Sequence, residues 1–126
     1  MTARRVLIVD DEDDIREVAQ ISLEMMAGWK VLTASSGCEG LRIARSDQPD
    51  AILLDVMMPD LDGPATFQKL LADSAIRHIP VIFLTAKLQP ADRRWFAELG
   101  VAGVLAKPFD PLKLAGQVTE ILRWPT

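Results

Sequence analysis

Short apolar runs recur along this chain, and a segment with helical periodicity follows each of them. The runs span residues 6–9, 30–34, 51–54 and 81–84, with a weaker one at 104–106. Several of them show no alternation of apolar and polar residues, which is typical of strands buried on both faces of a parallel sheet. The recurrence therefore predicts five strands covered by helices.

The intervening segments carry apolar faces that could cover such a sheet. In the first segment the predicted face comprises Ile15, Val18, Ala19, Ser22, Leu23 and Met26. In the last it comprises Leu114, Ala115, Val118, Ile121 and Leu122. Strict alternation with right-handed crossovers predicts a flavodoxin-like, doubly wound (βα)5 fold with strand order 2-1-3-4-5. We expect residues 1–126 to form a single domain.

Residues that favour the starts and ends of helices occur between the predicted strands. The run from Ser36 to Glu39 predicts a capping box, and Gly100 predicts the end of a helix. Gly63 followed by Pro64 predicts an N-cap and first helical residue, and Asp110 before Pro111 predicts another helix start.

Composition excludes several classes of protein. The net charge of −4, without a basic cluster interleaved with aromatics, argues against direct contact with nucleic acid. The single cysteine, Cys38, cannot form an internal disulfide. Neither a signal-peptide core nor an apolar run of membrane-spanning length occurs, so we expect a cytoplasmic protein without membrane contact.

Polar residues stand at the ends of four of the five predicted strands. Asp10 and Asp11 follow the first, Asp55 the third, Thr85 the fourth and Lys107 the fifth. Ligands of open α/β sheets bind outside these carboxyl ends, so the five side chains are predicted to share one site. Each has an ordinary structural explanation alone, as a turn former, helix cap or surface residue. The prediction rests on their conjunction.

The chemistry of this set points to phosphoryl transfer. Two carboxylates about 5 Å apart repel by roughly 3 kcal/mol at an effective dielectric constant near 20, so three of them favour a bound cation. Oxygen ligands with room for water and a phosphate suit Mg2+. Lys107 and Thr85 could bind an anion, which leaves Asp55 as nucleophile and Asp10 and Asp11 as metal ligands.

The motifs resemble those of receiver domains of two-component response regulators over essentially the whole chain. They are Asp10-Asp11, the run from Asp55 to Gly63, Leu84-Thr85-Ala86 and Lys107-Pro108-Phe109. The resemblance implies that Asp55 is the phosphoacceptor and, with Asp10, Asp11 and the backbone carbonyl of Met57, a Mg2+ ligand. It implies phosphoryl contacts from Thr85 and Lys107, and a cis peptide bond between Lys107 and Pro108.

The resemblance also implies the partners of the chain. The donor would be a phosphohistidine on a histidine kinase or phosphotransfer protein, and the chain would catalyse only its own phosphorylation and dephosphorylation. A downstream protein would bind the fourth helix, fifth strand and fifth helix. Val104 replaces the aromatic residue that receivers often carry in that region, so we expect a smaller conformational change. Met57 and Lys87 would flank the approach of water to the phosphoryl group.

Two other classes stay open at this stage. A dehalogenase-like phosphatase would need a second aspartate two residues after the nucleophile, where this chain has Met57. A receiver-like interaction module without phosphorylation would not need the acidic set. Flavin binding is disfavoured because the loop after the first strand is acidic. His78 is predicted to be exposed and without a role, and at least one of Trp95 and Phe96 to point outward.

Overall fold

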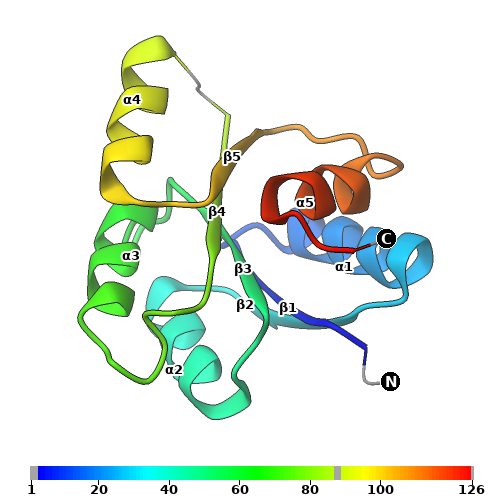
Figure 1. Ribbon diagram of the computed structural model, residues 1–126, viewed down its shortest axis with the longest axis horizontal. Helices are drawn as coiled ribbons and strands as arrows, with labels where there is room; N and C mark the ends of the chain where they lie inside the picture. The colour runs from blue at the N-terminus through cyan, green and yellow to red at the C-terminus, as the bar shows by residue number, and fades with distance from the viewer. Residues whose placement is uncertain (1–2, 87–88, 126) are drawn as a thin grey trace.

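The computed structural model describes residues 3–86 and 89–125 of the chain. Strands and helices alternate throughout this part, as the sequence predicts (Figure 1). The strands are β1 (Arg5–Val9), β2 (Lys30–Ala34), β3 (Ala51–Asp55), β4 (Val81–Thr85) and β5 (Gly103–Ala106). The helices are α1 (Asp13–Ala27), α2 (Gly37–Asp47), α3 (Gly63–Leu71), α4 (Pro90–Leu99) and α5 (Leu114–Leu122).

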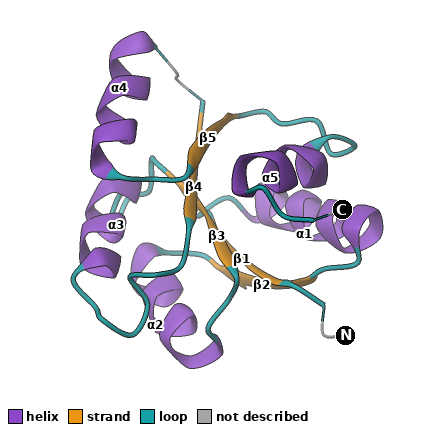
Figure 2. Cartoon of the chain, in the orientation of Figure 1, coloured by secondary structure: helices purple, strands orange, loops and turns teal. Residues whose placement is uncertain are grey.

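The strands form one parallel sheet in the order β2-β1-β3-β4-β5, which confirms the predicted topology. Helices α1 and α5 cover one face of the sheet, and α2, α3 and α4 cover the other (Figure 2). The strand order reverses between β1 and β3, and such a switch point is where ligands bind in open α/β sheets.

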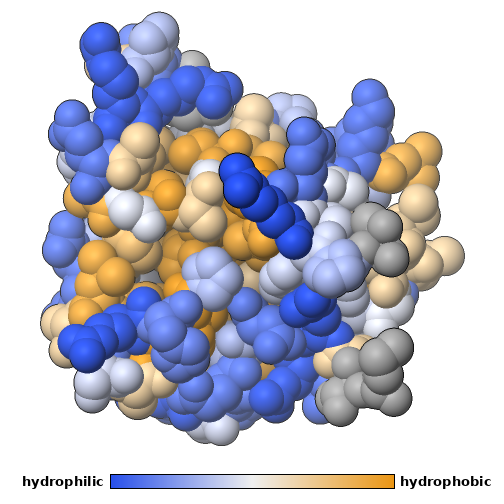
Figure 3. Space-filling view, viewed as in Figure 1, coloured by the Kyte–Doolittle hydropathy of each residue, from blue (hydrophilic) through white to orange (hydrophobic). Residues whose placement is uncertain are grey.

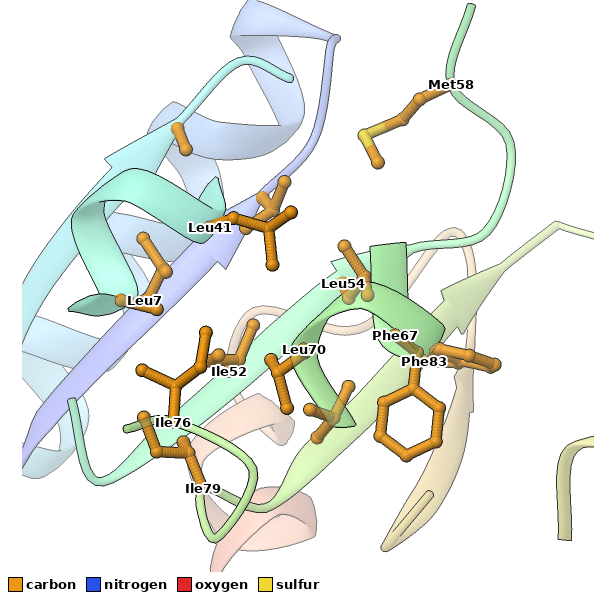
Figure 4. Close-up of a cluster of buried hydrophobic side chains, with 14 of the residues drawn as sticks. Leu7, Leu41, Ile52, Leu54, Met58, Phe67, Leu70, Ile76, Ile79 and Phe83 are labelled. Atoms are coloured by element: carbon orange, nitrogen blue, oxygen red, sulfur yellow. The ribbon is translucent and has the colours of Figure 1, made fainter. Parts of the chain in front are cut away.

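Buried side chains fill both faces of the sheet. Leu7 and Val9 belong to the cluster beneath α2, α3 and α4, whereas Val6 and Ile8 belong to the cluster beneath α1 and α5. The first cluster continues through Ile52, Leu54, Leu70 and Phe83, which converge on one another (Figure 4). Burial on both sides explains why these strands are continuously apolar in sequence. In the view of Figure 3, apolar residues show in the middle of the face and hydrophilic residues surround them.

The strand register brings the carboxyl ends level with each other. Asp55 pairs with Leu84 of the neighbouring strand, and Thr85 pairs with Ala106, directly before Lys107. Asp55 and Thr85 are thus the last residues of their strands, which end one residue later than the apolar runs suggest. This edge brings the predicted site residues together from neighbouring strands.

The helix starts match the sequence prediction in part. The Ser36 side chain accepts a hydrogen bond from the Glu39 amide at 3.1 Å, but the Glu39 carboxylate accepts from Ser35 and not from the N-cap amide. The prediction of Gly63 as an N-cap was wrong. Asp62 caps α3 by accepting from the Ala65 amide at 2.8 Å, because a carboxylate supplies the acceptor that glycine lacks.

The last helix also begins later than predicted. Asp110 caps a turn, accepting from the Leu112 amide with its side chain and from the Lys113 and Leu114 amides with its carbonyl. Helix α5 therefore starts at Leu114. The end of α4 agrees with the prediction, since Gly100 ends α4 in the left-handed conformation with φ of 101°.

Helix α1 buries fewer residues than its predicted apolar face contains. Ala19, Ser22 and Leu23 are buried, but Val18 and Met26 are exposed. Helix α1 shares its face of the sheet with α5, so only a narrow stripe of each helix reaches the core.

Two further predictions for side chains are confirmed, the exposure of His78 and the outward orientation of one residue of the pair Trp95 and Phe96. His78 and Cys38 are exposed, Phe96 is buried and Trp95 points outward, with nearly half of its surface exposed. Trp124 packs edge-on against Trp29. Within the described residues, no helix combines the length and apolar character that crossing a membrane requires.

Candidate functional site

The carboxyl edge of the sheet brings the predicted site residues together. Asp10 directly follows β1, Asp55 and Thr85 end β3 and β4, and Lys107 directly follows β5. Asp10, Asp55 and Thr85 are buried, although each carries a polar side chain. Burial of this kind is costly unless the groups bind one another, so their mutual contacts define the site.

Lys107 connects the strands at this edge. Its Nζ lies 2.9 Å from Asp10 Oδ2, 3.4 Å from Asp55 Oδ1 and 3.8 Å from Glu12 Oε1. Its backbone amide donates to the Thr85 carbonyl at 2.9 Å, which ties the lysine to the end of β4. The peptide bond that follows it, to Pro108, is cis, as predicted. The ammonium group therefore lies among three carboxylates.

Three carboxylates converge beside this ammonium group. Oxygen atoms of Asp10, Asp11 and Asp55 all lie within 4.8 Å of one another. Asp11 is exposed and faces solvent, while the other two are buried. The amide of Glu12 donates to Asp10 Oδ1 at 2.9 Å, so both oxygens of Asp10 have partners. Two of the three carboxylates are thus buried, and the third lies at the surface.

The loop after β3 shapes one side of the pocket. The Met57 amide donates to Asp55 Oδ1 at 3.3 Å, and the Gly63 amide donates to the Val56 carbonyl at 2.9 Å. A Cβ atom on Gly63 would lie 2.7 Å from the Asp55 carbonyl oxygen and 2.8 Å from Val56 Cα. The chain at residue 63 thus passes too close to the end of β3 for any side chain. The Met57 side chain is 64% exposed beside the pocket.

The environment changes the proton affinity of Asp55. Burial and the neighbouring Asp10 carboxylate raise the pKa of Asp55 from 3.8 to about 6, although Lys107 and the Met57 amide oppose this. A carboxylate in this position is ionised at neutral pH but poorly solvated. Such a group is reactive as a nucleophile and gains from a bound cation.

Lys107 keeps its charge in this setting. Burial lowers the pKa of Lys107, but its hydrogen bond to Asp10 and the charges of Asp10, Asp55 and Glu12 raise it by more, to above 10.5. The pocket therefore contains one firmly held cation among several carboxylates. It carries excess negative charge that an additional cation could neutralise.

The donor set fits a hard divalent cation. Carboxylate oxygens from Asp10, Asp11 and Asp55 can each supply one ligand, and no nitrogen or sulfur ligand belongs to the group. Three oxygen ligands leave positions for water and a phosphate oxygen, which is the usual arrangement for Mg2+. The site residues thus fit the metal that the sequence predicts.

Two contacts in the site escaped the sequence analysis. Glu12, the residue before α1, approaches Lys107 with its carboxylate, and its amide donates to Asp10. Arg16 donates from Nη1 to the Asp10 carbonyl at 2.7 Å and forms an ion pair with Asp13 through Nη2. An arginine three residues after an aspartate on a helix predicts that ion pair. Its contact with the end of β1 depends on tertiary placement. Lys87 lies outside the described residues.

The fold and the site define a class, the flavodoxin-like α/β domains with an acidic pocket and a lysine at the switch point of the sheet. Comparison with known proteins identifies the family. The sequence profile of the response regulator receiver domain matches residues 6–119. The chain belongs to the response regulator receiver domain family, which serves in signal transduction.

Relatives and solved structures agree with this family. The chain is 39% identical over 120 residues to the alkaline phosphatase synthesis transcriptional regulatory protein PhoP of Bacillus subtilis, covering 95% of the chain and 49% of PhoP. It is 40% identical over 119 residues to the DNA-binding dual master transcriptional regulator RpaA of Synechocystis, covering 94% of the chain and 49% of RpaA. It thus spans about half the length of these relatives.

The structural likeness extends over nearly the whole domain. The chemotaxis protein CheY4 of Vibrio cholerae superposes with a TM-score of 0.88 at 31% identity, covering 95% of this chain and 99% of that one. The receiver domain of the Francisella response regulator 1452 gives a TM-score of 0.83 at 29% identity, covering 95% and 97%.

Proposed function

We propose that this chain accepts a phosphoryl group on Asp55 in a Mg2+-dependent reaction and thereby switches the binding of a partner protein. The observation that carries the proposal is the position of Lys107. Its ammonium group lies 3.4 Å from Asp55 and 2.9 Å from Asp10, inside a pocket with three converging carboxylates. A nucleophile, a fixed cation and a metal-type ligand set are the components that phosphoryl transfer requires.

Asp10, Asp11 and Asp55 would hold the Mg2+ ion, together with the Met57 backbone carbonyl that the family resemblance suggests. When bound, the ion would neutralise charge on the phosphoryl oxygens and on the carboxylates around them. The buried Asp10 is already oriented by Lys107 and the Glu12 amide. The ligand set is therefore largely preorganised.

The transfer itself requires one bond to form and one to break. A carboxylate oxygen of Asp55 attacks the phosphorus of a phosphohistidine, the P–N bond breaks, and the histidine nitrogen leaves with its electron pair. Lys107 then pairs with a phosphoryl oxygen, and the Thr85 hydroxyl donates to another. Thr85 ends β4, the neighbour of β3, and Lys107 follows β5 on the far side of β4, with its Nζ 3.4 Å from Asp55.

The partners follow from the same chemistry. The donor is a histidine kinase or a histidine phosphotransfer protein, and the chain acts on no substrate other than its own aspartate. The phosphoryl group draws Lys107 and Thr85 toward it, which changes the surface of α4, β5 and α5 for a downstream protein. RpaA, which is DNA-binding, is matched by this chain over 49% of its length. Direct nucleic-acid binding by this chain is not proposed.

The test is incubation with acetyl phosphate and Mg2+, followed by intact-mass spectrometry and peptide mapping. A single stable phosphoryl group on Asp55, which EDTA prevents and Asp55→Asn abolishes, supports the proposal. Continued release of inorganic phosphate over many turnovers would point to a phosphatase. Absence of modification in a folded protein would point to an interaction module. A phosphoryl group on another residue would overturn the assignment of Asp55.

A further inference from the structure

Arg16, in the first turns of α1, reaches back to the end of β1. Its Nη1 donates to the Asp10 carbonyl at 2.7 Å, and its Nη2 pairs with Asp13. The side chain is only 18% exposed, so the guanidinium group lies along the protein surface between the strand and the helix. One side chain thus connects the two ends of the loop that carries Asp10 and Asp11.

We propose that Arg16 is a positioning residue for the Mg2+ site, an inference that rests on the function proposed above. The Asp10 carbonyl belongs to the peptide group that joins Asp10 to Asp11. A hydrogen bond to this carbonyl fixes the plane of that peptide, and with it the directions in which both carboxylates leave the backbone. Arg16 therefore orients two of the three carboxylates without touching the metal.

The chemistry of the guanidinium group suits this role. Its planar array of donors can bind a carbonyl and a carboxylate at once, whereas an ammonium group is a single compact charge. Charge-assisted hydrogen bonds of this type are also stronger than neutral ones. The rest of the Asp10 environment is fixed too, by the Ala34 carbonyl at its amide and by Lys107 and Glu12 at its carboxylate. The Asp10 carbonyl is the backbone acceptor that these contacts leave, and it accepts the hydrogen bond from Arg16.

A purely electrostatic role for Arg16 makes the opposite prediction. Removing a positive charge near three carboxylates should attract Mg2+ more strongly, because the local field becomes more negative. Loss of a positioning contact should weaken binding instead, because the ligands must then be ordered when the metal binds. The sign of the change in affinity separates the two roles.

The experiment titrates MgCl2 into the intact chain by isothermal calorimetry, for the wild type, Arg16→Gln and Arg16→Lys. Arg45→Gln serves as the matched control, since Arg45 also forms an ion pair, with Asp73, and lies on α2 away from the pocket. Urea unfolding in EDTA confirms that each variant is folded. We expect Arg16→Gln to bind Mg2+ about tenfold more weakly, as outer-shell contacts of metal ligands generally require. Arg45→Gln should match the wild type.

Arg16→Lys should recover only part of the affinity, because it keeps the charge but not the two-pronged geometry. Unchanged or tighter Mg2+ binding by Arg16→Gln would overturn the positioning role while leaving the proposed function intact. Full recovery by Arg16→Lys would overturn the role assigned to the guanidinium geometry, since a single ammonium donor would then suffice. A wild-type chain that bound no Mg2+ would overturn the proposed function itself and this inference with it.

Discussion

The replacement of Asp55 by asparagine should stabilise the folded protein when no divalent cation is present. Asp55 is 3% exposed and lies beside Asp10, so its ionised form is disfavoured in the folded state. Asparagine has nearly the same shape but carries no charge. It should therefore remove the repulsion while preserving the packing at the end of β3.

The size and pH dependence of the effect follow from the pKa of Asp55. Because folding raises this pKa from 3.8 to about 6, the folded state binds more protons than the unfolded state between these values. The free energy of unfolding of the wild type should then fall as the pH rises through that window, and stay low above it. A shift of about two pH units corresponds to ~3 kcal/mol, the largest gain expected for Asp55→Asn at pH 8.

The measurement is urea unfolding, followed by tryptophan fluorescence, between pH 4 and pH 8 in EDTA. The two proteins should have similar stability near pH 4 and diverge as the pH rises. Added Mg2+ should narrow the gap at pH 8, because the ion stabilises only the wild type appreciably. Asp60→Asn, in the exposed loop before α3, is the control and should shift stability by no more than about 0.5 kcal/mol. Equal or lower stability of Asp55→Asn at pH 8 in EDTA would refute the reasoning.

Three further substitutions test the surroundings of the pocket. Met57→Asn should speed the decay of the phosphorylated protein in excess Mg2+, because an amide can orient an attacking water and the exposed thioether cannot. Mass spectrometry measures the decay, and equal or slower decay of the variant would contradict this reason. Gly63→Ala should lower the free energy of unfolding in urea by ~1–3 kcal/mol, since its methyl group would meet backbone atoms at 2.7 and 2.8 Å. An unfolding midpoint equal to that of the wild type would show instead that the loop moves to accept the methyl group. Ser36→Ala should lower the free energy of unfolding by ~1 kcal/mol, because it removes the side-chain cap of α2. The Mg2+ affinity measured by calorimetry should not change. A lowered affinity would show that the start of α2 influences the site.

The sequence alone was sufficient for the topology and for the gathering of Asp10, Asp11, Asp55 and Lys107 at one edge of the sheet. Strands buried on both faces must be apolar at every position, so the runs at residues 6–9 and 81–84 are visible without a structure. Parallel strands all end at the same edge, so the residues that follow them must gather there. The positions of Asp10, Asp55 and Lys107 follow from these two facts.

Helix boundaries were less accessible to sequence reasoning. Asp62 and Gly63 are both plausible N-caps, and Asp110 caps a turn with the same hydrogen bonds it would give a helix. Local preference identifies the region in which a helix starts but not the residue, because neighbouring residues can satisfy the same backbone donors. The surrounding packing selects among them.

Tertiary structure alone determined the contacts within the site. Lys107 binds Asp10, which lies 97 residues earlier in the sequence. Whether the lysine side chain faces Asp10, Asp55 or solvent depends on the separation of β1 and β5 across the sheet. The pKa of Asp55 depends on burial beneath loops that its own strand does not encode. Arg16 reaches the Asp10 carbonyl, and Val18 and Met26 stay exposed, because of the way α1 packs against β1, β2 and α5. Periodicity fixes which residues share a helix face, but only the packing of distant elements fixes what that face meets.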